Sequence, residues 1–212
     1  MTPRLYFSSG ACSMAAHIAL EEASASFEAI PVLLAKGENR SASYLAVNPR
    51  GLVPVLEVDG EYLTEAVAIL LYIARRFPEA NLLPATGTMQ EARVFEWLAF
   101  LTNTVHVAYA ALWRPRRFTD DEAAAEIIAE GARGRIDALN RDIEKKMETR
   151  SFAIGSEYSV ADPFLLVFFR WANRVGLAAA ERYPAWTTWA QHMEKRRAVA
   201  RVLAKEGISL WE

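Results

Sequence analysis

Residues 47–63, VNPRGLVPVLEVDGEYL, decide the fold of the first half of the chain. Asp59-Gly60 separates two apolar-rich segments, and this dipeptide supplies the positive φ angles that a two-residue hairpin turn requires. Proline has no N–H, so Pro54 suits the start of a strand, and it holds Val53 in an extended conformation. We therefore predict a β-hairpin over residues 54–63.

Strands and helices alternate around this hairpin. Before it, the residue pattern predicts a strand at 4–7, a helix at 12–22, a strand at 28–33 and a short helix at 41–47. After it, Thr64 is expected to cap a helix that runs to about Phe77. The order β-α-β-α-β-β-α predicts an α/β domain of residues 1–80, in which helices pack on a mixed four-stranded sheet.

The rest of the chain predicts helices only. A linker is expected at residues 81–88, where proline and glycine interrupt the pattern, and an all-α helical bundle is expected at 89–212. One helix starts near Thr88. It has an apolar face (Val94, Trp97, Leu98, Leu101, Val105, Ala108, Leu112) and a second flank (Phe95, Thr102, His106, Tyr109, Trp113).

Three further helices are expected in this half. One covers Asp121 to Met147, and another follows the capping box Ser159-Val-Ala-Asp162. The run Phe164 to Trp171 is apolar on nearly all sides, so this helix should form the centre of the bundle. Trp186 to Arg197 is expected to form a last amphipathic helix, with the basic run 195–197 on its solvated face.

Composition excludes several classes of protein. The chain has 212 residues, a net charge of -2, three histidines and one cysteine. One cysteine permits no internal disulfide or multi-cysteine metal site, and the scattered histidines show no metal-ligand spacing. No strongly basic surface is indicated, so we expect no nucleic-acid or membrane partner. A lone thiol and the absence of a long apolar segment favour a soluble, cytoplasmic protein.

Three features together suggest a binding site for a small thiol peptide, and His106 is a separate candidate. Cys12 opens a helix after a glycine turn, where free N–H groups are expected to lower the pKa of its thiol. Val53 can pair with a peptide backbone, and the helix that starts at Glu65 can hold a carboxylate beside an ammonium group. His106 lies on the second flank of the long helix. Each feature also has a structural interpretation: Cys12 and His106 as packed core, Pro54 as a strand start, and Glu65 as a first-turn acid.

Several segments resemble bacterial beta-class glutathione S-transferases over nearly the whole chain. They are Leu5-Tyr-Phe-Ser-Ser-Gly-Ala-Cys-Ser13, Val47-Asn-Pro-Arg-Gly-Leu-Val-Pro-Val55, Leu63-Thr-Glu-Ala-Val-Ala-Ile69, Glu96-Trp97-Leu98, His106, Ser159-Val-Ala-Asp162 and Arg170-Trp171. The resemblance implies a thioredoxin-like N-terminal domain, a homodimer, and glutathione as the co-substrate that is joined to a small hydrophobic electrophile.

The resemblance also implies roles for individual residues. Cys12 and His106 would be catalytic, with Cys12 near the glutathione sulfur. Glutathione would contact Val53, a cis Pro54, Glu65, Ala66, Leu34 and Lys36, while Phe7, Tyr109, Trp113 and Trp171 would line the second-substrate pocket.

The sequence differs from the family pattern at some positions. Relatives often have Tyr at Phe7, Ser or Gly at Ala66, and Lys at Val107, and some have Asn and an acid at Ala99 and Thr104. Two alternatives therefore stand beside the transferase. One is a glutathione-dependent thiol reductase or peroxidase that uses a Cys12 mixed disulfide; the other is a catalytically weak glutathione- or ligand-binding protein.

Overall fold

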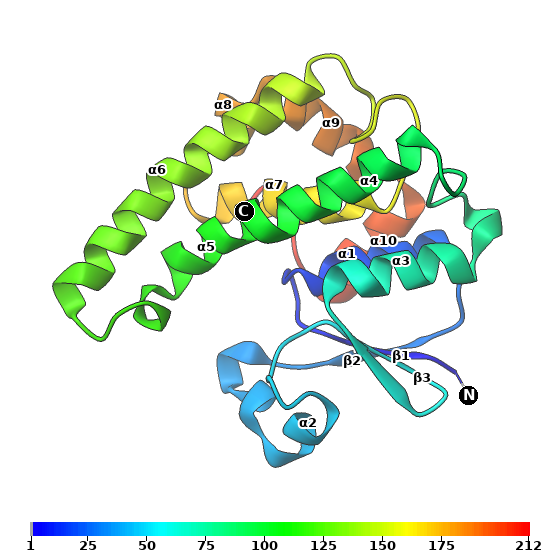
Figure 1. Cartoon of the computed structure of the whole chain (residues 1–212), viewed down its shortest axis with the longest axis horizontal. Coiled ribbons are helices and arrows are strands. Elements are labelled where there is room, and N and C mark those ends of the chain that lie inside the picture. Colours follow the sequence, from blue (N-terminus) through cyan, green and yellow to red (C-terminus); the bar gives the residue numbers. More distant parts are fainter. Residues whose placement is uncertain (1) are drawn as a thin grey trace.

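The computed structural model describes residues 2–212. Figure 1 shows a small sheet at one end of the molecule and a bundle of long helices at the other. Helices α1 (Ser13–Glu22) and α3 (Ala66–Arg76) lie side by side between them. The same α1 also contacts the helical domain through α7 (Ala161–Arg174) and α10 (Arg197–Glu206).

The sheet confirms the predicted mixed four-stranded arrangement. Its strands are β1 (Arg4–Phe7), β2 (Glu28–Pro31), β3 (Val55–Val58) and β4 (Glu61–Thr64), in the order β2-β1-β3-β4. β1 is parallel to β2, and the other two pairs are antiparallel. Asp59 and Gly60 have φ angles of 50° and 87°, so the hairpin turn has the left-handed conformation that its dipeptide predicts.

The connection between β2 and β3 is made of short helices. These are η1 (Leu34–Lys36), η2 (Glu38–Arg40) and α2 (Ala42–Val47). The predicted cap at Thr64 is wrong, because Thr64 is the last residue of β4 and its hydroxyl accepts a hydrogen bond from Arg50. Glu65 is the residue before α3, and its backbone has a left-handed φ of 69°.

The second half is helical, as expected. After η3 (Pro78–Ala80) it contains α4 (Met89–Phe100), η4 (Leu101–Val105), α5 (His106–Trp113), η5 (Pro115–Arg117), α6 (Glu122–Met147), α7, α8 (Ala179–Arg182), α9 (Pro184–Glu194) and α10. The expected uninterrupted helix from Thr88 is therefore wrong in one respect. Residues 101–105 form a π-helical turn, which changes the direction of the side chains that follow.

Helix α7 forms the centre of the bundle, as predicted. Its residues from Ala161 to Ala172 are all buried. The capping box is confirmed in part: the Asp162 carboxylate accepts hydrogen bonds from the N–H groups of Ser159 (2.8 Å) and Ala153 (2.7 Å), but the Ser159 hydroxyl accepts from the Ala161 N–H and not from the Asp162 N–H. Complete burial raises the pKa of Asp162 to about 7, although these donors oppose the shift.

The expected helix over 186–197 exists as α9 (Pro184–Glu194), but it is shorter than predicted and is not the last helix. α9 ends at Glu194, and α10 follows it and packs on α1. Arg196 does not lie on a solvated helix face. It forms an ion pair with Glu22 of α1 (2.6 Å), and its guanidinium lies 3.8 Å from the centre of the Tyr158 ring. These contacts join the two halves of the chain, which local periodicity does not reveal.

Two features are absent from residues 2–212. No helix there is long and apolar enough to cross a membrane. No group of three or more His, Cys, Asp and Glu side chains is arranged to hold a metal ion.

Candidate functional site

One cavity of about 550 Å³ brings together residues from both domains. It is lined by eight of the residues that the sequence singled out: Cys12, Leu34, Val53, Pro54, Glu65, Ala66, His106 and Trp171. The thioredoxin-like domain supplies the first six, and α5 and α7 supply the last two. Side chains separated by more than 150 positions in the chain therefore share one site.

The Val53-Pro54 peptide bond is cis, as the resemblance implied. The neighbouring turn is held by Leu52, whose carbonyl accepts hydrogen bonds from the Tyr44 hydroxyl and the Asn48 side chain, both at 2.8 Å. The Val53 carbonyl accepts a 3.5 Å hydrogen bond from the Cys12 thiol. The start of β3 and the start of α1 thus meet at the cavity.

Cys12 is the residue before α1, but its thiol is not activated as the sequence predicted. Burial raises the pKa of the Cys12 thiol to about 11. The backbone N–H groups of Cys12 and Ser13 and the charge of Arg114 favour the thiolate, but their effect is smaller. The expectation of a lowered pKa is therefore wrong, because desolvation outweighs the donors at the helix start.

Glu65 and Ala66 lie at the start of α3, where backbone N–H groups have no partners within the helix. The Glu65 carboxylate forms a 2.9 Å ion pair with Arg50, which also donates to Thr64. A left-handed φ is uncommon outside glycine, so tertiary contacts must hold Glu65 in this conformation.

His106 follows the π-helical turn and lines the cavity. Its ring lies 5.3 Å from the Trp171 ring and 6.2 Å from the Phe168 ring, measured between centroids. Burial and the nearby charges of Arg114 and Arg117 lower the pKa of His106. Its imidazole is therefore neutral at neutral pH and can accept a proton or a hydrogen bond.

The glycine turn before Cys12 is held by the C-terminal half of the chain, which sequence analysis missed. The Gly10 N–H donates to the Glu206 carboxylate, and the Gly10 carbonyl accepts from the Trp171 indole, both at 2.8 Å. The same Glu206 also accepts a 2.8 Å hydrogen bond from His17, and both side chains are fully buried. Sequence analysis found no cluster around His17 because its partner lies 189 positions away.

Gly10 is required at this turn for two reasons. Its φ is +66°, a conformation that side chains other than glycine rarely adopt. An added Cβ would also lie 2.4 Å from the Arg170 guanidinium. A larger residue at this position would therefore force the buried Arg170 guanidinium, which donates to the Ser209 carbonyl, to move.

Four of the implied site residues lie outside the cavity lining. Phe7 and Tyr109 are buried, with exposed fractions of 7% and 0%, so the prediction that they line a pocket is corrected: both belong to the core. Trp113 is partly exposed and packs on Trp171, with ring centroids 4.7 Å apart. Lys36 is exposed on η1 and does not line the cavity.

Relatives often have a tyrosine hydroxyl at the position of Phe7, and the adjacent Tyr6 does not supply it. Tyr6 points to the other side of β1, into a small cluster with Val32, Tyr44 and Val55. Its hydroxyl donates to Glu57 at 2.9 Å.

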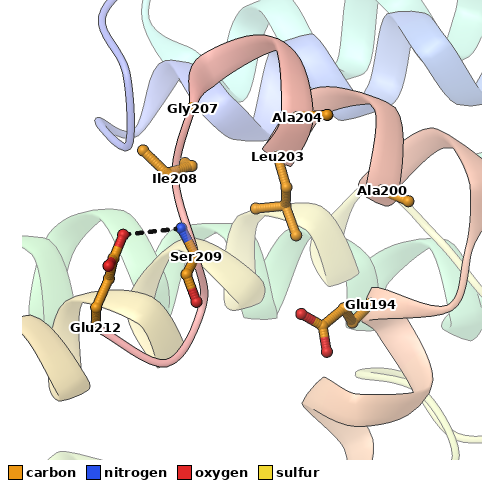
Figure 2. A pocket seen from close by; sticks show the side chains of 8 residues that line it. All are labelled: Glu194, Ala200, Leu203, Ala204, Gly207, Ile208, Ser209 and Glu212. Carbon is orange, nitrogen blue, oxygen red and sulfur yellow. Dashed lines mark hydrogen bonds between the residues drawn. The ribbon is translucent and has the colours of Figure 1, made fainter.

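A second hollow, of about 470 Å³, lies beside α10 and the C-terminal segment (Figure 2). Its two carboxylates already have partners, since Glu194 accepts from the Trp211 indole and Glu212 accepts from the Ser209 N–H. These groups fix the end of the chain, and the hollow brings together no reactive side chains.

Known proteins share this architecture. Residues 3–75 match the family model for the N-terminal domain of glutathione S-transferases, and residues 104–197 match the model for the C-terminal domain. Glutathione S-transferase GstA of Escherichia coli O157:H7 is 31% identical over 97% of this chain and 99% of its own length.

Solved structures agree with these matches. A glutathione transferase homologue from Sulfitobacter, with bound glutathione, has a TM-score of 0.92 and 33% identity, and the match covers 98% of this chain and 99% of that one. The beta-class enzyme of Sphingomonas chungbukensis has a TM-score of 0.85 and 36% identity, with 97% and 100% coverage. The chain belongs to the glutathione S-transferase family, and its similarity to the Sphingomonas enzyme supports the bacterial beta class.

Proposed function

We propose that this chain is a glutathione transferase that joins the sulfur of glutathione to small hydrophobic electrophiles. The observation that carries the proposal is the shared cavity, which is lined by Cys12, the cis Val53-Pro54 step and the start of α3 at Glu65. This is the set of features that a peptide with a thiol and an amino-acid head group requires. The relatives named as glutathione S-transferases and the glutathione-bound Sulfitobacter structure support it.

In this proposal, the backbone of glutathione pairs with Val53, and its γ-glutamyl group lies at Glu65 and Ala66. The N–H groups at the start of α3 stabilise the γ-glutamyl carboxylate, and Glu65 attracts its ammonium group. Leu34 lies beside the peptide. The glutathione sulfur then lies at the start of α1, close to Cys12.

The chemical step is the attack of the glutathione thiolate on an electrophilic carbon. The thiol proton is released to a base or to water, the S–C bond forms, and the leaving group departs with its electron pair. When glutathione binds, the protonated Cys12 thiol turns from the Val53 carbonyl and donates its hydrogen bond to the thiolate, and the α1 N–H groups add to its stabilisation. Neutral His106, on the opposite wall, accepts the proton.

Two measurements test this function. Isothermal titration with glutathione should give binding below the millimolar range, and conjugation of chlorodinitrobenzene should be faster than the uncatalysed reaction. The absence of binding at millimolar glutathione would contradict the proposal.

The raised pKa of Cys12 disfavours the thiol-reductase alternative, which requires a Cys12 thiolate. Intact-mass analysis after treatment with oxidised glutathione separates the two. A transferase should show little adduct and retain conjugation in Cys12→Ser. A rapid adduct on wild type, together with reductase turnover that disappears in Cys12→Ser, would favour the reductase.

We also propose that the protein is a cytoplasmic homodimer. Large apolar side chains are exposed on β4, α3 and α4, namely Tyr62, Tyr72, Met89 and Phe95, and a second copy would bury them. Light scattering coupled to size exclusion should give twice the mass of the chain, and a monomer at micromolar concentration would contradict the dimer. Cell fractionation tests the compartment.

A further inference from the structure

The cavity as a whole carries an excess of positive charge. Four arginines line the cavity, namely Arg40, Arg50, Arg114 and Arg117, and Glu65 is its only acidic lining residue among those that the structure describes. Glu65 is paired with Arg50. A pocket for a purely hydrophobic electrophile would not need the other three charges.

Arg114 and Arg117 are not neutralised by neighbouring acids. Within residues 2–212, neither guanidinium has a carboxylate within ion-pair distance. The adjacent Arg116 behaves differently, since it pairs with Glu122 at 2.9 Å, donates to the Asp120 carbonyl, and does not line the cavity. Partial burial and the charge of Arg117 lower the pKa of Arg114, as expected for cations that lack a counter-ion.

The two arginines lie at the end of the cavity where the reaction takes place. Thr102, His106 and Ala110 line the cavity at four-residue spacing along η4 and α5, and Arg114, the residue after α5, lines it next to them with its N–H bonded to the Ala110 carbonyl. The charge of Arg114 also acts on the Cys12 thiol, and both arginines act on His106.

The two arginines on the wall formed by the thioredoxin-like domain, Arg40 and Arg50, can be explained by the binding of glutathione. Under the proposed function, its γ-glutamyl carboxylate lies at the start of α3, and Arg40 and Arg50 belong to the same domain as that helix. Arg114 and Arg117 belong to the opposite wall, beside His106. The second substrate must approach the sulfur from that side.

We infer that the second substrate carries an anionic group, such as a carboxylate, and that Arg114 and Arg117 bind this group while the electrophilic carbon faces the glutathione sulfur. The inference rests on the proposed function and narrows its substrate class. Guanidinium groups suit it because their planar N–H donors match the two oxygens of a carboxylate. In the test reaction below, the S–C bond forms, the C–Cl bond breaks, chloride leaves with the bonding pair, and the thiol proton passes to His106 and from there to solvent.

The test compares two electrophiles that differ in charge, chlorodinitrobenzene and chlorodinitrobenzoate. The measured quantity is the ratio of kcat/KM for the benzoate to kcat/KM for the neutral compound, which cancels any general loss of activity. Arg114→Ala and Arg117→Ala should each lower this ratio by about 10-fold, the effect of losing one partly exposed charge-assisted contact. Arg116→Ala is the matched control and should leave the ratio within about 2-fold of wild type.

Several results would overturn the inference. One is an unchanged ratio in both Arg114→Ala and Arg117→Ala. A second is an equal loss in Arg116→Ala, which would indicate a general charge effect. A third is a higher KM for glutathione in the Arg114 and Arg117 variants with either electrophile, while the ratio of the two kcat/KM values stays constant. The arginines would then bind glutathione and not the second substrate.

A binding measurement separates this inference from the proposed function. If wild type converts neither compound, the transferase proposal fails, but quenching of tryptophan fluorescence by the benzoate without glutathione still tests the anion site. The inference expects binding to be about 10-fold weaker in Arg114→Ala and in Arg114→Gln, and equal binding by all the variants would refute it.

Discussion

The single cysteine should react slowly with small alkylating reagents, although it stands at a helix start. Burial raises the pKa of the Cys12 thiol to about 11, from an ordinary value of 9.0. At neutral pH, a rise of two units leaves about 100-fold less thiolate than an ordinary cysteine has. A more basic thiolate is also a better nucleophile, and this offsets about 10-fold of the loss. The net expectation is alkylation about 10-fold slower than that of a free thiol.

The assay uses iodoacetamide, which is small and neutral, and follows the reaction by intact mass. The chain has one cysteine, so each added carbamidomethyl group reports on Cys12 alone. The folded protein should react about 10-fold more slowly than the urea-unfolded chain, and its rate should keep rising with pH up to about 11. Cys12→Ser should take up no label.

One result would refute this reasoning. If folded Cys12 reacts as fast as free glutathione or faster, and its rate levels off near neutral pH, then the thiol is a thiolate. The donors at the start of α1 would then outweigh burial, and the mixed-disulfide alternative would regain support.

Three further predictions concern the groups that support the site. Glu206→Gln removes the charge from a buried pair and should lower the free energy of unfolding by about 3 kcal/mol in urea titrations, whereas Glu96→Gln, in an exposed pair with Arg93, should cost no more than about 1 kcal/mol; equal losses would contradict this. Gly10→Ala should reduce both Tm and kcat/KM more than Gly60→Ala, because both positions have positive φ but only the first lacks space for a Cβ; similar effects would show that the clash does not matter. Burial raises the pKa of Asp162 from 3.8 to about 7, so the protonated form is favoured by folding. Asp162 therefore contributes its full stabilisation below about pH 4, and this stabilisation is lost as the pH rises through about 7. The unfolding free energy of wild type should fall by up to about 4 kcal/mol across that range, and that of Asp162→Asn should not. Parallel pH profiles of the two proteins would refute this prediction.

Local sequence was sufficient to predict the elements of the thioredoxin-like domain. The hairpin followed from Asp59-Gly60, whose conformational preference does not depend on distant residues. The capping box at Ser159 and Asp162 was predictable for the same reason, since both partners lie within one helical turn. Resemblance then supplied the cis Val53-Pro54 step, which residue type alone permits but does not require.

The errors arise where a distant group decides the local structure. Thr64 belongs to β4, and its hydroxyl accepts from Arg50 and does not cap α3; the expected uninterrupted helix is interrupted by the π-helical turn before His106. Phe7 and Tyr109 were assigned to a pocket because aromatic spacing cannot distinguish a lining residue from a core residue.

The sequence by itself determined the order of strands and helices, the position of Cys12 at a helix start, and the family to which the chain belongs. These properties depend on turn chemistry, periodicity and short motifs, all of which act within a few residues. Only the tertiary structure decided the protonation of Cys12, because desolvation depends on everything packed around the thiol. It alone also brought Glu206 to Gly10, and Arg114 and Arg117 to the same cavity as Cys12, since contacts across such separations form only when the two domains pack.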